Sequence, residues 1–300
     1  MLIVEDFQCM NYNCKIVRDD LFPFPGGGNK ARKAIEYEKV FIEGGYNAIV
    51  TTGGIQSNHC RAMAILATRN NWHCHLVYQG SQSRFEAEKG NALLVRKTCA
   101  TMEFVGSDGT SDAMDGAMER YREAGLKPYY VTGGGHDIAG GLAYVKATQE
   151  LKRYCDAVGW KPDVIFLASG TGSTQVGILV GLHQMGWDEV KVFGISVARK
   201  QDRGLNVMHD FMKTLEGYLN LSDDFDDRLF FRDDFLCGGY EMKSPQMEKW
   251  LDEIMFQTGV YFDTTYSGKA LWGMYHILNT VDTYKNVLFW HTGGLMNLLK

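Results

Sequence analysis

Short runs of apolar residues alternate with longer segments of helical periodicity along most of the chain. A strand that is covered on both faces reads as an unbroken apolar run, so these runs predict parallel strands flanked by helices. The predicted strands are 48–52, 74–78, 101–105, 129–132, 164–168, 191–197 and 287–290. The predicted helices are 31–43, 57–69, 86–97, 111–124, 138–157, 174–184 and 244–257. This alternation is typical of an α/β fold.

The composition is that of an ordinary globular chain of 300 residues, 45% of them hydrophobic and 22% charged. A net charge of -5 argues against nucleic acid and anionic membranes as partners. No apolar run reaches the about 18 residues of a membrane span. The segment MLIVEDFQC has acids and no basic residue, so we expect no signal peptide. The acid-rich segment 221–234 predicts a solvated loop and an edge strand.

The cysteines bear on the compartment and on metal binding. There are 7 of them, widely scattered and without a C-x-x-C pair. This spacing predicts reduced thiols, a cytoplasmic location and no structural zinc site. His73 and His75 alternate on one predicted strand with no third ligand nearby, so we expect no metal there.

Glycine is the unusual feature, with 34 glycines against 5 prolines. Four glycine-rich turns follow predicted strands, at 53–54, 133–135, 170–172 and 293–294. Turns at the carboxyl ends of parallel strands can line one crevice, where the backbone approaches a ligand.

Lys30 ends the run GGGNK just before a predicted helix. The helix dipole and partial desolvation favour the neutral, nucleophilic form of a lysine at this place, as a Schiff base requires. A surface loop with two basic residues, Lys30 and Lys33, would explain the same pattern. Local spacing leaves both interpretations open.

Two further junctions carry candidate binding groups. The segment SGTGST at 169–174 opens a helix, where successive amides and hydroxyls can hold a phosphate; a plain turn of small residues is the alternative. In GGIQSNH at 53–59, a helix cap explains Ser57 or Asn58 alone. The whole cluster could seat a carboxylate and offer an amide to a ring hydroxyl.

Taken together, GGGNKARKAIEY, TTGGIQSNHCRA, SGTGSTQVG and HTGG resemble the pyridoxal 5′-phosphate (PLP) enzymes of the D-cysteine desulfhydrase and 1-aminocyclopropane-1-carboxylate (ACC) deaminase family. The resemblance implies the tryptophan synthase β-like fold, fold type II, with two α/β domains of open twisted parallel sheets and PLP in the cleft. We expect a small domain at 45–143 and a large PLP-binding domain at 1–44 and 144–300. The resemblance also implies a homodimer, an amino-acid substrate and no metal.

The resemblance assigns roles to individual residues. Lys30 would form the Schiff base and return as general base. Asn58 would bind the ring oxygen, and Ser57, with the amides of Asn58 and His59, would bind the substrate carboxylate; Ser57 would also join proton transfer. The phosphate would be held by Thr171, Gly172, Ser173 and Thr174. The resemblance further places Tyr240 and Tyr266 in the active site as catalytic residues.

Three positions favour one branch of the family. Ser267, Thr292 and His59 resemble desulfhydrases, since deaminases carry Glu, Leu and commonly Gln there. A hydroxyl near the ring nitrogen leaves the ring closer to neutral than a carboxylate does. We therefore expect a lyase that performs α,β-elimination on D-cysteine or a similar β-substituted amino acid, giving pyruvate, ammonia and sulfide. An ACC deaminase giving 2-oxobutanoate, and a non-catalytic PLP or amino-acid-binding homologue, are the alternatives.

Overall fold

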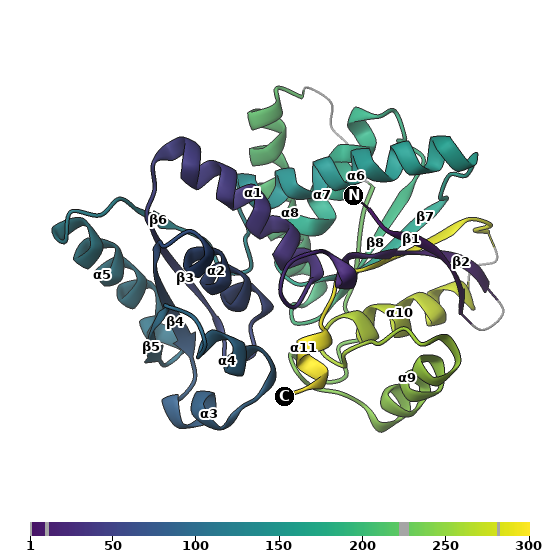
Figure 1. Cartoon of the computed structure of the whole chain (residues 1–300). Coiled ribbons are helices and arrows are strands. Elements are labelled where there is room, and N and C mark those ends of the chain that lie inside the picture. Colours follow the sequence, from purple (N-terminus) through teal and green to yellow (C-terminus); the bar gives the residue numbers. More distant parts are fainter. Residues whose placement is uncertain (1, 10–11, 222–227, 281–282) are drawn as a thin grey trace.

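The computed structural model of the chain describes residues 2–9, 12–221, 228–280 and 283–300. It confirms the α/β fold, with one sheet of six strands and one of four (Figure 1). In Figure 1 the smaller sheet and its helices lie on the left, and the larger sheet with the two termini lies to their right.

The larger sheet has the strand order β1-β2-β10-β7-β8-β9 and the smaller sheet the order β5-β4-β3-β6. The strands are β1 (Val4–Cys9), β2 (Tyr12–Arg18), β3 (Ala48–Gly54), β4 (His73–Gln79), β5 (Thr101–Val105), β6 (Pro128–Tyr130), β7 (Val164–Ser169), β8 (Lys191–Ser196), β9 (Leu229–Arg232) and β10 (Val287–His291). All neighbours pair in parallel except β1 and β2, which are antiparallel. This pair was not predicted from the sequence, because the burial of β1 varies along the strand and the strand does not form an apolar run.

The helices are α1 (Gly28–Gly44), α2 (Asn58–Arg69), α3 (Gln82–Ala87), α4 (Gly90–Val95), α5 (Thr110–Glu123), α6 (Ile138–Val158), α7 (Ser173–Gln184), α8 (Gln201–Leu219), α9 (Pro245–Thr258), α10 (Ser267–Leu278) and α11 (Leu295–Leu298). The single helix predicted at 86–97 is wrong, since the chain forms α3 and α4 instead. Gly90 takes a φ of +53°, and a Cβ there would lie 2.4 Å from the Met296 carbonyl oxygen. Helices α8 and α10 were not predicted from the sequence.

Each sheet is covered on both faces. In the larger sheet, α6, α7 and α8 pack on one face and α9 and α10 on the other. In the smaller sheet, α1, α2 and α4 pack on one face and α5 on the other. The apolar face of α1 thus joins the core of the smaller sheet, although the predicted division assigns residues 1–44 to the large domain. The predicted boundary after residue 143 falls inside α6, and the domain limits stay a prediction.

The acid-rich segment is described only in part. Residues 222–227 lie outside the described residues. The predicted edge strand is confirmed as β9, which pairs with β8 at the end of the larger sheet. Within the described ranges, no helix is both long enough and apolar enough to cross a membrane.

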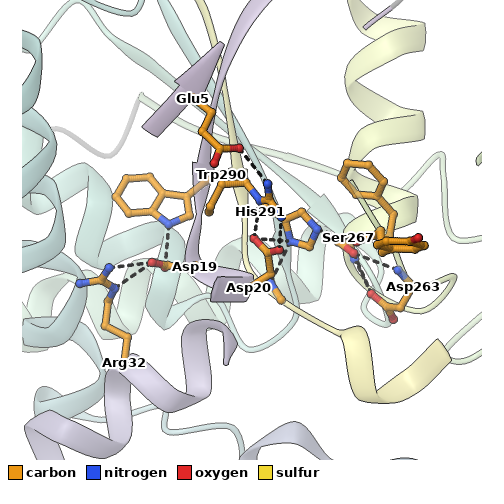
Figure 2. Close-up of polar contacts among 12 residues, drawn as sticks. Glu5, Asp19, Asp20, Arg32, Asp263, Ser267, Trp290 and His291 are labelled. Atoms are coloured by element: carbon orange, nitrogen blue, oxygen red, sulfur yellow. Dashed lines mark hydrogen bonds and ion pairs between the residues drawn. The ribbon is translucent and has the colours of Figure 1, made fainter. Parts of the chain in front are cut away.

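A buried carboxylate connects the first segment of the chain to the centre of the larger sheet. Asp19 is 1% exposed and accepts hydrogen bonds from Arg32 of α1, from Tyr144 of α6 (2.6 Å) and from Trp290 of β10 (2.8 Å). Figure 2 shows the Arg32 and Trp290 side chains converging on it. Because each donor comes from a different element, this cluster links the segment after β2 to α1, α6 and β10.

Candidate active site

The loop before Lys30 depends on three successive glycines. Gly26, Gly27 and Gly28 all have positive φ, at +82°, +51° and +86°. The Asn29 amide donates to the Thr292 carbonyl oxygen at 2.8 Å, and a Cβ on Gly28 would lie 2.8 Å from that same oxygen. This close approach brings the turn after β10 against the start of α1.

Lys30 projects from this loop toward two other glycine turns. Its Nζ donates to the Gly134 carbonyl oxygen at 2.8 Å. A Cβ on Gly134 would lie 2.9 Å from Thr171 Cγ2 and 3.6 Å from Lys30 Nζ. Desolvation by burial lowers the pKa of Lys30 to about 8, so about a tenth of the amine is neutral and nucleophilic at pH 7, far more than for an ordinary lysine.

Lys33 lies one turn further along α1, and the sequence analysis assigned it no role. Its side chain is 0% exposed, and Nζ donates to Ser173 Oγ at 2.7 Å and to the Gly135 carbonyl oxygen at 3.1 Å. Desolvation lowers its pKa well below the ordinary value. No carboxylate of the described residues forms an ion pair with it. The available signal was its spacing from Lys30, which places both side chains on the same face of α1.

The segment 169–174 forms the junction between β7 and α7. Gly172 caps the helix with a φ of +91°. Asn29 Nδ2 donates to Thr174 Oγ1 at 3.1 Å, and Ser173 Oγ donates to the Gly135 carbonyl oxygen at 2.9 Å. The free amides of a helix N-terminus next to a buried lysine form an environment that favours an anion, so the residues present fit a phosphate group.

The start of α2 carries the next predicted residues. Ser57 Oγ accepts the Cys60 amide at 3.1 Å and so caps the helix. Asn58 Oδ1 accepts hydrogen bonds from Arg61 Nη1 and Asn91 Nδ2. The His59 imidazole is 2% exposed and bonds to Thr51 Oγ1 at 2.9 Å. The His59 side chain is therefore engaged within the smaller sheet, and the predicted role of its backbone amide in binding a carboxylate stays a prediction.

Tyr240 and Tyr266 lie together, with 2.5 Å between their Oη atoms. A Cβ on Gly54, at the end of β3, would lie 4.0 Å from Tyr240 Cε1. The pair therefore reaches from the larger sheet to the carboxyl end of the smaller one. Desolvation raises the pKa of Tyr240 to about 12 and that of Tyr266 well above its ordinary value, so both are protonated near neutral pH.

Ser267 is bonded to a carboxylate that the sequence analysis missed. Its Oγ donates to Asp263 Oδ1 at 2.9 Å, and both side chains are buried. Figure 2 shows the two side chains against each other, on the far side of His291 from Asp19. A Cβ on Gly294 would lie 2.2 Å from Asp263 Oδ1, so this pair adjoins the turn that carries Thr292. The hydroxyl hydrogen of Ser267 is thus already donated within the protein.

The structure brings the predicted residues to the carboxyl ends of β3, β7 and β10, around the start of α1. Across the described part of the chain, no three His, Cys, Asp or Glu side chains are grouped to hold a metal ion. The expectation that the chemistry needs no metal stays a prediction.

Known proteins resemble this chain over most of its length. The pyridoxal-phosphate dependent enzyme family matches residues 12–293. D-cysteine desulfhydrase of Salmonella typhimurium is 28% identical over 285 residues, covering 93% of this chain and 86% of that protein. The mitochondrial bifunctional D-cysteine desulfhydrase/ACC deaminase of Arabidopsis thaliana is 29% identical over 300 residues, covering 94% of this chain and 72% of that protein.

The solved structures agree on the fold. A crystal structure of an ACC deaminase homologue superposes with a TM-score of 0.87 at 26% identity, over 96% of this chain and 86% of that one. A hydrogen sulfide-producing enzyme of Fusobacterium nucleatum reaches a TM-score of 0.67 at 14% identity, over 98% of this chain and 95% of that one, which shows the fold alone. The chain therefore belongs to the pyridoxal-phosphate dependent enzyme family, in its branch of D-cysteine desulfhydrases and ACC deaminases.

Proposed function

We propose that this PLP-dependent lyase eliminates the β-substituent of D-cysteine or of a similar β-substituted amino acid. With D-cysteine and water, the products would be pyruvate, ammonia and hydrogen sulfide. The single observation that carries the proposal is the position of Lys30, whose amine lies at the meeting of three glycine turns with its pKa lowered by burial to about 8. The names of the Salmonella and Arabidopsis relatives supply the substrate class.

The residues of this chain fit the cofactor at both of its ends. Lys30 would bind its aldehyde carbon, and Asn58 Nδ2 would donate to its ring oxygen. Lys33 and the start of α7, including Thr171, Gly172, Ser173 and Thr174, would hold its phosphate. When bound, the cofactor supplies an electron sink for the carbanion at the substrate Cα.

Proton transfer falls to Lys30 and the two tyrosines. Ser57 and the amides at the start of α2 would hold the carboxylate of the substrate. The substrate Cα would then face the neutral Lys30 amine, which would take the proton from Cα. The electron pair left at Cα would form the Cα–Cβ double bond as the Cβ–S bond breaks, and sulfur would leave with the electrons of the broken bond. Tyr240 and Tyr266 are protonated and share a short hydrogen bond, so the pair can donate a proton to the departing sulfur.

ACC deamination is the second candidate, because the Arabidopsis relative is named for both activities. We propose that Ser267 and Thr292 separate the two reactions in this chain. A non-catalytic PLP-binding homologue is the third candidate, and the retention of Lys30, Ser57 and both tyrosines argues against it.

The test is keto-acid release from D-cysteine and from ACC, measured in parallel on PLP-saturated protein. We expect pyruvate from D-cysteine, none from ACC, and neither product from a Lys30→Ala variant. L-cysteine serves as the stereochemical control. Release of 2-oxobutanoate from ACC would contradict the role given to Ser267 and Thr292, and no product from any amino acid would favour the non-catalytic homologue.

We also propose that the enzyme is a cytoplasmic homodimer. The resemblance to the family supports the dimer, and the free cysteines support the compartment. Sedimentation of the PLP-loaded protein at several concentrations would test the oligomeric state, and a monomer at all of them would overturn it.

A further inference from the structure

Arg61 is a buried guanidinium without a carboxylate partner. Its side chain is 1% exposed, and no carboxylate of the described residues forms an ion pair with it. Its Nε has no hydrogen-bond partner within the described chain. Desolvation lowers its pKa to about 10, which still leaves it charged near neutral pH. A buried charge is costly unless its hydrogen bonds are made, so the bonds that Arg61 does make point to its role.

All three of those bonds go to neutral oxygen atoms around the candidate active site. Nη1 donates to Asn58 Oδ1 and to Asn91 Oδ1, each at 2.9 Å, and Nη2 donates to the Gly27 carbonyl oxygen at 2.9 Å. A Cβ on Gly26 would lie 2.6 Å from Arg61 Cζ, so the glycine loop packs directly on the guanidinium. Arg61 therefore connects the loop that precedes Lys30 with the side chain of Asn58.

These contacts determine which way the Asn58 amide faces. Its Oδ1 accepts from Arg61 Nη1 (2.9 Å) and from Asn91 Nδ2 (3.0 Å). An amide oxygen has two lone pairs, so both are used, and Nδ2 is left as the group that can donate elsewhere. The Asn91 side chain is itself held in place. Its Oδ1 accepts from Arg61 Nη1, and its Nδ2 donates to the Gln56 carbonyl oxygen at 3.0 Å.

We infer that Arg61 is a positioning residue that acts through Asn58: it holds the Asn58 amide with Nδ2 toward the cofactor's ring oxygen and strengthens that amide as a donor. The inference rests on the proposed function, since it needs the cofactor in this site. A donor polarised by a cation favours the ionised form of an oxygen that accepts from it. Arg61 should thereby lower the pH at which the bound cofactor loses the proton shared by its ring oxygen and its neighbouring nitrogen.

Other ionisable groups surround this point and must stay constant in a test. They are Lys30 and Lys33 on α1, His59 on α2, Glu88 through Gln56, and Tyr240 and Tyr266 from the larger sheet. Each is retained in the variants below, so a change in titration is attributable to Arg61 and Asn58.

The experiment is a pH titration of the visible absorbance of the PLP-loaded protein, with cofactor affinity measured alongside. The variants are Arg61→Gln, Arg61→Lys, Asn58→Ala and the double variant Asn58→Ala/Arg61→Gln. Arg96→Gln is the matched control. Arg96 also donates to backbone carbonyl oxygens, those of Phe85 and Glu88, but it does not bond to Asn58. Circular dichroism and melting of each cofactor-free protein verify folding.

We expect Arg61→Gln to raise the midpoint of the titration by about one pH unit and to weaken cofactor binding by about tenfold. Arg61→Lys keeps the charge but cannot make the forked set of bonds, so its shift should be smaller. The Arg61→Lys variant also serves as the test if Arg61→Gln does not fold. Asn58→Ala should raise the midpoint as well, and the double variant should shift no further than Asn58→Ala. Arg96→Gln should leave the midpoint unchanged.

The outcomes separate this inference from the proposed function. A midpoint unchanged in Asn58→Ala would overturn the role proposed for Asn58 itself. A shift in Asn58→Ala without one in either folded Arg61 variant would overturn the inference alone. Additive shifts in the double variant would show that Arg61 acts on the cofactor directly and would also overturn it.

Discussion

Two lysines on the same face of α1 differ in what surrounds their amines. Lys30 Nζ donates to the Gly134 carbonyl oxygen, whereas Lys33 Nζ donates to that oxygen and also to Ser173 Oγ. Burial lowers the pKa of both. The Lys30 amine is suited to attack a carbonyl carbon. The Lys33 amine lies where a bound anion would favour its protonated, positively charged form.

The pKa of Lys30 predicts how fast the cofactor-free enzyme takes up PLP. Only the neutral amine attacks the aldehyde, so the rate should rise with pH through about pH 8 and then level off. An ordinary lysine would give a midpoint more than two pH units higher, at about 10.4. Stopped-flow absorbance at a series of pH values measures this rate. A rate that is still rising steeply at pH 10 would contradict the lowered pKa, and Lys30→Ala is the blank.

Asp263 makes a second prediction at the level of one residue. Its buried carboxylate accepts from the amides of Thr265, Tyr266 and Ser267 and from the Ser267 hydroxyl. Asp263→Asn turns one of these acceptors into a donor, and we expect a loss of about 3 kcal/mol in the free energy of unfolding. Ser267→Ala removes one bond and should cost about 1 kcal/mol. Urea denaturation measures both, and equal losses would show that Asp263 does not organise this turn.

At the scale of elements, the site is built from helices that begin where parallel strands end. The starts of α2 and α7 follow β3 and β7, and α1 begins against the turn after β10. Their N-termini present unpaired amides to one region, which favours the phosphate and carboxylate groups of an amino-acid and PLP pair. The glycines let these starts approach one another more closely than side chains would allow.

A substitution at Gly172 tests this close approach of the helix starts most directly. A Cβ there would lie 2.1 Å from Met208 Cγ at a φ of +91°, whereas Gly186, after α7, has a φ of +66° and nothing within 4 Å. Gly186→Ala should cost only the backbone strain, about 1 kcal/mol. Gly172→Ala adds overpacking and should cost about 3 kcal/mol or more. Urea denaturation and PLP titration measure stability and affinity. Weakened PLP binding is expected only for Gly172→Ala, and equal effects would contradict the packing argument.

At the scale of the whole molecule, side chains from the helices and turns around one sheet bond to side chains from those around the other. The Asn91 side chain on α4 bonds to Asn297 on α11 at 3.1 Å, and Arg84 pairs with Glu241 at 3.3 Å.

The buried thiols are distributed over both sheets, with Cys14 on β2 and Cys74 on β4. Thiol reactivity therefore reports on the integrity of both.

Thiol labelling should distinguish the exposed cysteine from the buried ones. Cys99 is exposed, Cys237 is half-buried and the others are buried. Burial also raises the pKa of Cys60 to about 12, which removes the reactive thiolate. We expect one fast site at Cys99, a slower one at Cys237 and the remainder only in denaturant. Ellman titration with a Cys99→Ser control measures this. Rapid labelling of every thiol in the native protein would contradict the described packing.

The sequence by itself determined the α/β class, most strands and helices, and the blocks around Lys30, Asn58, Thr171 and Thr292. Apolar runs and glycine turns are local signals, and a short segment carries them whole. Only the tertiary structure decided that Lys33 meets Ser173, that Arg61 bonds to Asn58, and that Asp263 accepts a hydrogen bond from the Ser267 hydroxyl. It also decided that β1 is antiparallel and that α1 packs on the smaller sheet. The reason is physical. Lys33 and Ser173 are 140 residues apart, so no local pattern relates them. Arg61 and Asn58, and Asp263 and Ser267, are close in the chain, but whether such polar side chains are buried together depends on the distant segments that pack around them.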